Sequence, residues 1–287
     1  MLPIRNAGAA LLLDGKTLVL YDAASGDIPD SSFMSFTAFP PEAVSLTYSD
    51  GATVLDTTLT RGDAYAGWVA SGTTTSGFPV LDRTAGTQVN FSLQVESEAH
   101  ENNNRAGFSV IILDQDARGI ELSFWPNEIW TQNDDSMGGL FTHGEGVVFA
   151  TDAGPADYQV MISGDTYTLS ANTVSILSGP VRDYTNFEGF LDPYETPNFL
   201  FFGDNTTSAQ SRVRLRFASV TGTEPVLPTS AVASTRIPQP TAIAPSSPTA
   251  TPVSTVPQLC PSGWLVGIVI IANPMLLRKI RRRMINR

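Results

Sequence analysis

A group of polar and aromatic side chains in the middle of the chain has the residue types that bind sugars. Apolar and polar residues alternate over 120–125, so Glu121, Ser123 and Trp125 fall on one face of a predicted strand. Aromatic rings stack on the apolar C–H faces of sugars, and planar polar groups hydrogen-bond their hydroxyls. We therefore expect a site for a glycan or another matrix ligand, with these candidate residues: His100, Asn103, Arg105, Glu121, Ser123, Trp125 and Trp130.

The same residues also fit a purely structural role. Trp125 would then belong to a core on the second face of the sheet. Glu121 and Arg105 would form a cross-strand ion pair that contributes about 0.2–1 kcal/mol. Both alternatives remain open on the sequence alone.

Motifs for catalysis are incomplete. Some sandwich glycosidases of the laminarinase type carry Glu, Asp and Glu at alternate positions of one strand, whereas here Glu121 is followed by Ser123 and Trp125. The sequence has no G-x-S-x-G elbow, and His100 and His143 are its only histidines. We predict that the protein is not an enzyme, with an unusual glycosidase as a distant alternative.

Metal-binding patterns are equally incomplete. The segment 114–119, DQDARG, begins like a calcium loop, but Arg118 stands where the third oxygen ligand belongs. A turn, in which Gly119 is free to take a positive φ, is the preferred interpretation, while calcium at 133–135 or 204–205 stays open. The single cysteine, Cys260, excludes an intramolecular disulfide and cysteine-based zinc sites. No cofactor is predicted.

The elements that would position the candidate residues are short strands. Residues 107–113 form an apolar run that the polar turn 114–119 joins to the strand 120–125, and a third strand follows. Alternation or apolar runs indicate further strands at 17–21, 44–48, 53–59, around Trp68, 89–95, 147–150, 157–171 (a hairpin), 174–177, 198–203 and 213–217. Such a series without long helices is typical of an all-β, two-sheet antiparallel sandwich or jelly roll. The predicted core residues are Phe91, Leu93, Leu122, Phe124, Val160, Leu169, Leu200, Val213 and Leu215.

Charge is distributed unevenly along the chain. The net charge is −11, yet six of the 17 basic residues lie in the last ten positions, where no acid occurs. The remainder is therefore strongly acidic, which disfavours binding to nucleic acid.

Composition divides the chain into four parts. The sandwich is expected over 16–221, after an N-terminal segment, 1–15, whose start we interpret as truncated or mis-assigned. Residues 222–258 are rich in Pro, Thr and Ser and predict a disordered stalk. Residues 259–287 contain an apolar stretch followed by the basic cluster, which predicts a C-terminal helical membrane anchor with its tail in the cytoplasm and the sandwich outside the cell.

Several stretches resemble a known group of exported bacterial proteins. They are RAGFSVIILDQDARGIELSFWPNEIWTQND, LFTHGEG, YQVMISGDTYTLSAN, LSGPVRDY and DPYETPNFLFFGDNTTSAQSRVRLRFASV. These look like concanavalin A-like sandwich proteins of the choice-of-anchor or PEP-CTERM type, although the Val-Pro-Glu-Pro sorting motif is absent. The resemblance implies an exported surface protein and supplies no catalytic residues. Together with the residue pattern, it leads us to expect a membrane-anchored module that binds glycan without catalysis. The alternative is a structural or adhesive protein without a small-molecule site.

Overall fold

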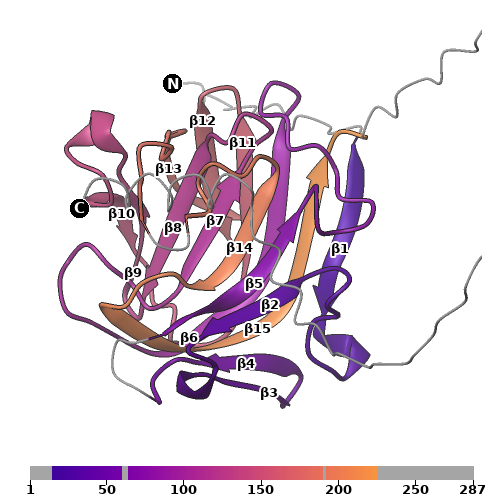
Figure 1. The fold of residues 1–287 in the computed structure, drawn as a ribbon, viewed down its shortest axis with the longest axis vertical. Helices are drawn as coiled ribbons and strands as arrows, with labels where there is room; N and C mark the ends of the chain where they lie inside the picture. The colour runs from indigo at the N-terminus through magenta and orange to yellow at the C-terminus, as the bar shows by residue number, and fades with distance from the viewer. Residues whose placement is uncertain (1–14, 60–63, 190–191, 225–287) are drawn as a thin grey trace, which may run out of the picture. The chain divides into compact units, whose positions relative to one another are not determined.

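Two antiparallel β-sheets pack face to face in the computed structural model, which describes residues 15–59, 64–189 and 192–224 (Figure 1). The predicted all-β jelly-roll sandwich is confirmed. Three predicted parts lie outside the described residues: the N-terminal segment up to residue 14, the stalk from residue 225 onwards, and the membrane anchor 259–287. Within the described ranges, every helix is a single short turn, and none has the length and apolarity needed to cross a bilayer.

One sheet contains eight strands. Its order is β13-β12-β11-β6-β15-β4-β3, and β1 also pairs with β15. The long strand β15 pairs along one side with β6, and its other side is shared by β4 and then β1, with a bulge between Leu215 and Phe217. The strands are β1 (Lys16–Asp22), β3 (Ser45–Ser49), β4 (Ala52–Asp56), β6 (Thr87–His100), β11 (Ala156–Ser163), β12 (Thr166–Ala171), β13 (Val174–Pro180) and β15 (Ala209–Gly222).

The second sheet contains seven strands in the order β10-β9-β8-β7-β14-β5-β2. They are β2 (Ser35–Phe39), β5 (Tyr65–Ser71), β7 (Ser109–Leu113), β8 (Gly119–Trp125), β9 (Glu128–Gln132), β10 (His143–Val148) and β14 (Phe199–Asp204). Three 3₁₀ turns, η1 (Ala23–Ser25), η2 (Pro41–Ala43) and η3 (Asp135–Met137), lie in connections. Sequence reasoning missed β2, and it placed the strand at β10 later, over 147–150.

The inward faces of the two sheets form one large core. All nine predicted core residues are at most 1% exposed. Phe91 of the first sheet packs edge-on against Phe124 and Phe202 of the second, with ring centroids 6.1 and 5.6 Å apart. Period-2 alternation therefore identified the buried side of each sheet correctly.

The turn between β7 and β8 forms as expected, with one correction. The Asp114 carboxylate accepts hydrogen bonds from the backbone N–H groups of Asp116 and Arg118. The left-handed residue is Ala117 (φ 57°), whereas a positive φ had been expected at Gly119. Gly119 is needed because a Cβ there would overlap the carbonyl group of Ile112 on the neighbouring strand.

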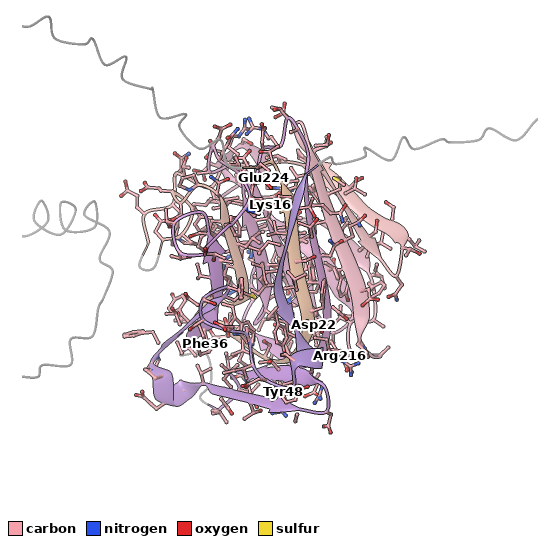
Figure 2. All side chains as sticks on the ribbon, turned by 90° about the vertical axis from the view of Figure 1, so that its right-hand side faces the viewer. Lys16, Asp22, Phe36, Tyr48, Arg216 and Glu224 are labelled. Carbon is pink, nitrogen blue, oxygen red and sulfur yellow. The ribbon has the colours of Figure 1, made fainter. Side chains whose placement is uncertain are left out.

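The ends of the sandwich meet. Lys16 at the start of β1 and Glu224 after β15 lie 3.7 Å apart, nitrogen to oxygen, and Figure 2 shows them side by side. The three arginines of β15, Arg212, Arg214 and Arg216, are half-buried on the outer face of its sheet. Arg212 joins a surface ion-pair network there, donating to Asp56 (2.7 Å) and Glu96 (2.6 Å).

Candidate functional site

The outer face of the seven-stranded sheet carries a second apolar layer. Ile111, Leu113 and Phe199 on this face pack against Phe141, Tyr184 and Tyr194 from connecting segments. The face was expected to be an open binding surface. The covering segments instead bury Glu121, Ser123 and Trp130, which are 1%, 0% and 0% exposed.

Phe141 anchors this cover. Its backbone is left-handed (φ 57°), which is unusual and costly for a bulky side chain. Its ring lies 5.1 Å from the ring of Phe187 and 5.1 Å from that of Tyr194, and its carbonyl accepts a hydrogen bond from Arg105. These contacts hold Phe141 in place at the edge of the cover.

A cavity of about 290 Å³ lies between the cover and the sheet. Aromatic rings and polar groups both line it. The lining residues are Tyr65, Arg105, Glu121, Gln132, Phe141, Phe187, Pro193, Tyr194, Asn205, Thr206, Thr207 and Ser208. Two of the seven predicted ligand-binding residues, Arg105 and Glu121, are among them.

Glu121 is the most unusual group of the cavity. Its carboxylate accepts hydrogen bonds from the Tyr194 hydroxyl (2.5 Å) and the Asn205 side-chain amide (2.8 Å). Burial raises the pKa of Glu121, and these hydrogen bonds offset only part of the effect. Burial and the neighbouring carboxylate raise the pKa of Tyr194 well above its usual value, so its phenol keeps its proton and remains a donor.

Arg105 stands beside the cavity without forming the ion pair considered for it. Its Nη1 donates to the backbone carbonyls of Asn104 and Phe141, each at 2.7 Å. The guanidinium carbon lies 5.3 Å from the centroid of the Phe141 ring. Arg105 and Glu121 thus face one cavity and have separate partners.

The two central tryptophans form a stack with the two histidines. The ring centroids of His100 and Trp125 are 4.3 Å apart, those of His143 and Trp130 are 4.1 Å apart, and both pairs are nearly parallel. Trp125 also meets Trp130 at 5.3 Å and donates its indole N–H to the Arg105 carbonyl at 2.9 Å. One face of Trp125 is therefore covered by His100, and Trp130 is fully buried. Neither ring offers the open stacking platform that was expected.

The remaining candidates have supporting positions. The backbone carbonyl of the exposed Asn103 lies 3.1 Å from His143 Nδ1 and accepts a hydrogen bond in the histidine tautomer that has its proton on this nitrogen. The Ser123 hydroxyl accepts from the Gln132 side-chain amide at 3.4 Å. All seven residues gather around the outer face at β8 and β9, but only Arg105 and Glu121 reach the cavity.

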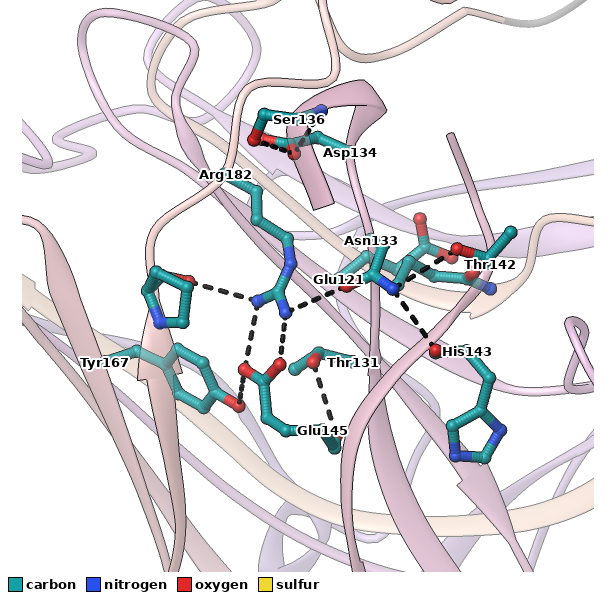
Figure 3. A network of polar contacts seen from close by, with 12 residues as sticks. Glu121, Thr131, Asn133, Asp134, Ser136, Thr142, His143, Glu145, Tyr167 and Arg182 are labelled. Atoms are coloured by element: carbon teal, nitrogen blue, oxygen red, sulfur yellow. Dashed lines mark hydrogen bonds and ion pairs between the residues drawn. The ribbon is translucent and has the colours of Figure 1, made fainter. Parts of the chain in front are cut away.

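A second polar network lies beside these residues on β9 and β10 (Figure 3). The buried Arg182 binds Glu145 through both terminal nitrogens, and the Tyr167 hydroxyl donates to the same carboxylate at 2.7 Å. Burial acts to raise the pKa of Glu145, but the hydrogen bonds from Arg182 and Tyr167 outweigh it and lower that pKa. This network joins β10 to β12 and β13, and Arg182 Nε is buried without a hydrogen-bond partner among the described residues.

Protein donors engage an acidic side chain in each of the two segments where calcium stayed open. Asp134 accepts from Ser136 and from the backbone of Asp183, and Asp204 accepts from the Thr57 hydroxyl at 2.7 Å. Among the residues that the structure describes, no group of three or more His, Cys, Asp or Glu side chains is placed to hold a metal.

Sequence reasoning missed most polar residues of the cavity, among them Gln132, Tyr194 and Asn205. Gln132 lies two positions after Trp130 on the same strand face, so extending the alternation of β9 would have found it. Tyr194 and Asn205 lie 73 and 84 positions after Glu121, and no local pattern connects them with it.

No family model and no curated protein matches the sequence. Among solved structures, the chain resembles the endo-β-1,3-glucanase of Pyrococcus furiosus at 8% identity and a TM-score of 0.46, over 72% of this chain and 95% of that one. It also resembles alginate lyase A1-II′ of polysaccharide lyase family 7 at 12% identity and a TM-score of 0.40, over 74% of this chain and 96% of that one. A third similar structure is the family 29 carbohydrate-binding module CBM29_1 of Piromyces equi, at 10% identity and a TM-score of 0.32, over 72% of this chain and 91% of that one. Similarity at this level assigns no activity to this chain.

Proposed function

We propose that this protein is a surface-displayed carbohydrate-binding module, and that its binding site is the cavity at Glu121. The observation that carries the proposal is the composition of the cavity wall. Aromatic rings of Tyr65, Phe141, Phe187 and Tyr194 stand beside the polar groups of Glu121 and its neighbours. Stacking rings and convergent polar groups are the two elements that sugar recognition requires.

The geometry of Glu121 supports a preorganised site. Tyr194 and Asn205 each hold one oxygen of its carboxyl group, so the polar wall is fixed before any ligand arrives. Preorganised groups lose less conformational entropy on binding. A volume of about 290 Å³ suits a single sugar unit better than a long stretch of chain.

The cavity supports binding better than glycoside hydrolysis. Retaining and inverting glycosidases place two carboxyl groups on either side of the scissile bond. Glu121 is the one carboxylate among the described residues that line the cavity, and both of its oxygens are already engaged. We therefore propose recognition without cleavage.

We also propose that the sandwich is held outside the cell by the C-terminal residues 259–287, through the stalk 222–258. The support is the sequence alone: an apolar stretch followed by six basic residues, preceded by a segment rich in proline. A choice-of-anchor or PEP-CTERM type of protein would share this layout.

A glycan array with the full chain tests the proposed binding. The protein is kept in a polyoxyethylene detergent, so that no sugar headgroup competes for the site. We expect saturable binding to a subset of glycans, and we expect Glu121→Gln to weaken it about tenfold or more, because the variant replaces one of the two acceptor oxygens that Tyr194 and Asn205 hold with a donor group. The exposed Glu42→Gln serves as a matched control and should bind like the parent.

Two results would contradict the proposal. One is the absence of saturable binding by the folded parent protein to any glycan, which would favour the structural alternative. The other is release of shortened sugars during incubation with a bound oligosaccharide, which would replace binding by catalysis.

A further inference from the structure

Arg105 keeps one edge of its guanidinium unused. Its Nη1 is held by the carbonyls of Asn104 and Phe141. Its Nε and Nη2 donate to no group within the described part of the chain. The Nε–Nη2 edge presents two parallel N–H donors, which is the arrangement that binds a carboxylate through both oxygens.

Four other arginines of the sandwich differ in this respect, whereas Arg118 and Arg216, which do not line the cavity, also have no carboxylate within 4 Å among the described residues. Arg83, Arg182, Arg212 and Arg214 each have a carboxylate partner within 4 Å. Arg105 has none among the described residues, although it lies in a strongly acidic protein and lines the cavity. Burial raises the pKa of Glu121 and the charge of Arg105 across the cavity acts to lower it, but the two groups form no ion pair. A cation that is held by two carbonyl groups and has no ion-pair partner is suited to an anionic ligand.

Gln132 supplies a second, independent observation. Its side chain lines the same cavity and is 2% exposed. Its amide nitrogen donates to the Asn104 carbonyl (3.3 Å) and the Ser123 hydroxyl (3.4 Å). Its oxygen Oε1 is buried and accepts no hydrogen bond from the described residues. A buried acceptor without a donor is costly, so a ligand hydroxyl at this position would be stabilising.

From these two observations we infer that the cavity takes an acidic sugar, whose carboxylate binds the Nε–Nη2 edge of Arg105 and one of whose hydroxyls donates to Gln132 Oε1. The inference rests on the proposed carbohydrate-binding function, because it names the class of sugar for the same site. The state of Glu121 is compatible with it, since burial raises the pKa of this carboxyl and reduces the repulsion that an anionic ligand would meet.

A matched set of ligands tests the inference on the full chain in the same detergent. The probes are methyl β-D-glucopyranosiduronate, its methyl ester, methyl β-D-glucopyranoside and acetate, together with the galacto and manno forms of the three sugars. Binding is followed by NMR of ¹⁵N-labelled protein at the arginine Nε–H signals, where the signal of Arg105 is the one that Arg105→Lys removes. We expect at least one uronate to bind about tenfold or more tightly than its ester and its neutral partner, and to shift the Arg105 signal.

Variants locate the effect. Arg105→Lys should remove most of the preference for acid over ester, because an ammonium group cannot form the two parallel bonds. Arg212→Lys, on the other sheet, is the control and should keep the preference. Should Arg105→Lys fail to fold, the comparison of acid with ester on the parent protein still decides the question.

The outcomes separate this inference from the proposed function. Equal binding of a uronate, its ester and its neutral partner would overturn the inference and leave carbohydrate binding intact. Acetate that binds as tightly as the uronates would also overturn it, since the site would then recognise any small carboxylate. A lack of binding by every probe and by every glycan on the array would overturn both.

Discussion

The clearest energetic prediction concerns the buried Asp204 at the end of β14. Its side chain is held by the Thr57 hydroxyl (2.7 Å) and the backbone N–H of Thr206 (3.2 Å), and it forms no ion pair among the described residues. Burial raises the pKa of Asp204 well above its usual value, the hydrogen bonds offset part of this, and the nearby Glu98 adds a further increase. We predict that Asp204→Asn stabilises the protein at neutral pH.

The sign follows from proton linkage. Between the unfolded pKa of an aspartate, about 3.9, and the raised folded value, the native state binds more protons than the unfolded state. The stability that Asp204 contributes is therefore complete at pH values below about 3.9 and is lost as the pH rises through the folded pKa. In this window, one extra bound proton lowers the free energy of unfolding of the parent protein by up to about 1.4 kcal/mol per pH unit as the pH rises. The free energy of unfolding of Asp204→Asn should therefore exceed that of the parent by an amount that grows with pH at up to this rate and then levels off.

The local hydrogen bonds suit the variant. Thr57 Oγ1 also lies 3.3 Å from the Ser211 carbonyl, so it can donate there and accept from the new amide group. The amide side chain of the variant thereby resembles the protonated acid.

Urea unfolding of the full chain at a series of pH values, followed by tryptophan fluorescence, measures this difference. Asp30→Asn is a control of opposite sign, because hydrogen bonds from Ser32 lower the pKa of Asp30, so this variant should lose stability above the unfolded pKa. A difference between Asp204→Asn and the parent that does not change with pH would refute the reasoning, since it would mean that the pKa of Asp204 is the same in the folded and unfolded states.

Three further predictions concern the core, the polar network and the cellular address. Leu122→Ala should reduce the free energy of unfolding by about 2–5 kcal/mol, because the side chain is fully buried, and a loss below about 1 kcal/mol in urea unfolding would contradict the packing described. Arg182→Met should reduce the free energy of unfolding by about 3–5 kcal/mol, and the loss should lie towards the lower value because the Glu145 side chain is 26% exposed. If adding Glu145→Gln restores this stability, the unpaired charge of Glu145 is the cause of the loss. The full chain should fractionate with membranes, and removal of 264–287 should release it to the soluble fraction; an unchanged distribution would contradict the proposed anchor.

The fold could be predicted largely from the sequence because each sheet has one continuous buried face. Alternating residues such as Phe91, Leu93 and Phe124 identified that face directly. The strand β2 was missed because the segment SFTAF at the edge of its sheet is short and only weakly alternating. The turn after β7 was predicted by its aspartates, but Ala117 and not Gly119 is left-handed, and Gly119 is required instead by its close approach to Ile112 on the neighbouring strand.

The candidate site was predicted only in part because its environment is tertiary. Strand alternation placed Glu121 on the outer face correctly, and it could not show that Phe141 and Tyr194 cover this face. That cover changes Glu121 from an exposed group into a buried one that two distant side chains hold. It also moves the proposed site from Trp125, which His100 covers, to the cavity.

The most direct test of the proposed site is to map a bound sugar on the protein. The ¹⁵N side-chain amide signals of Asn205 and Gln132 can be followed by NMR while the full chain is titrated with a saccharide that binds on the array. Both residues line the cavity, so binding there should shift both signals with one saturation curve, and Glu121→Gln should weaken that curve. Saturable shifts confined to residues outside the cavity lining, with these two amides unchanged, would contradict the assignment of the site.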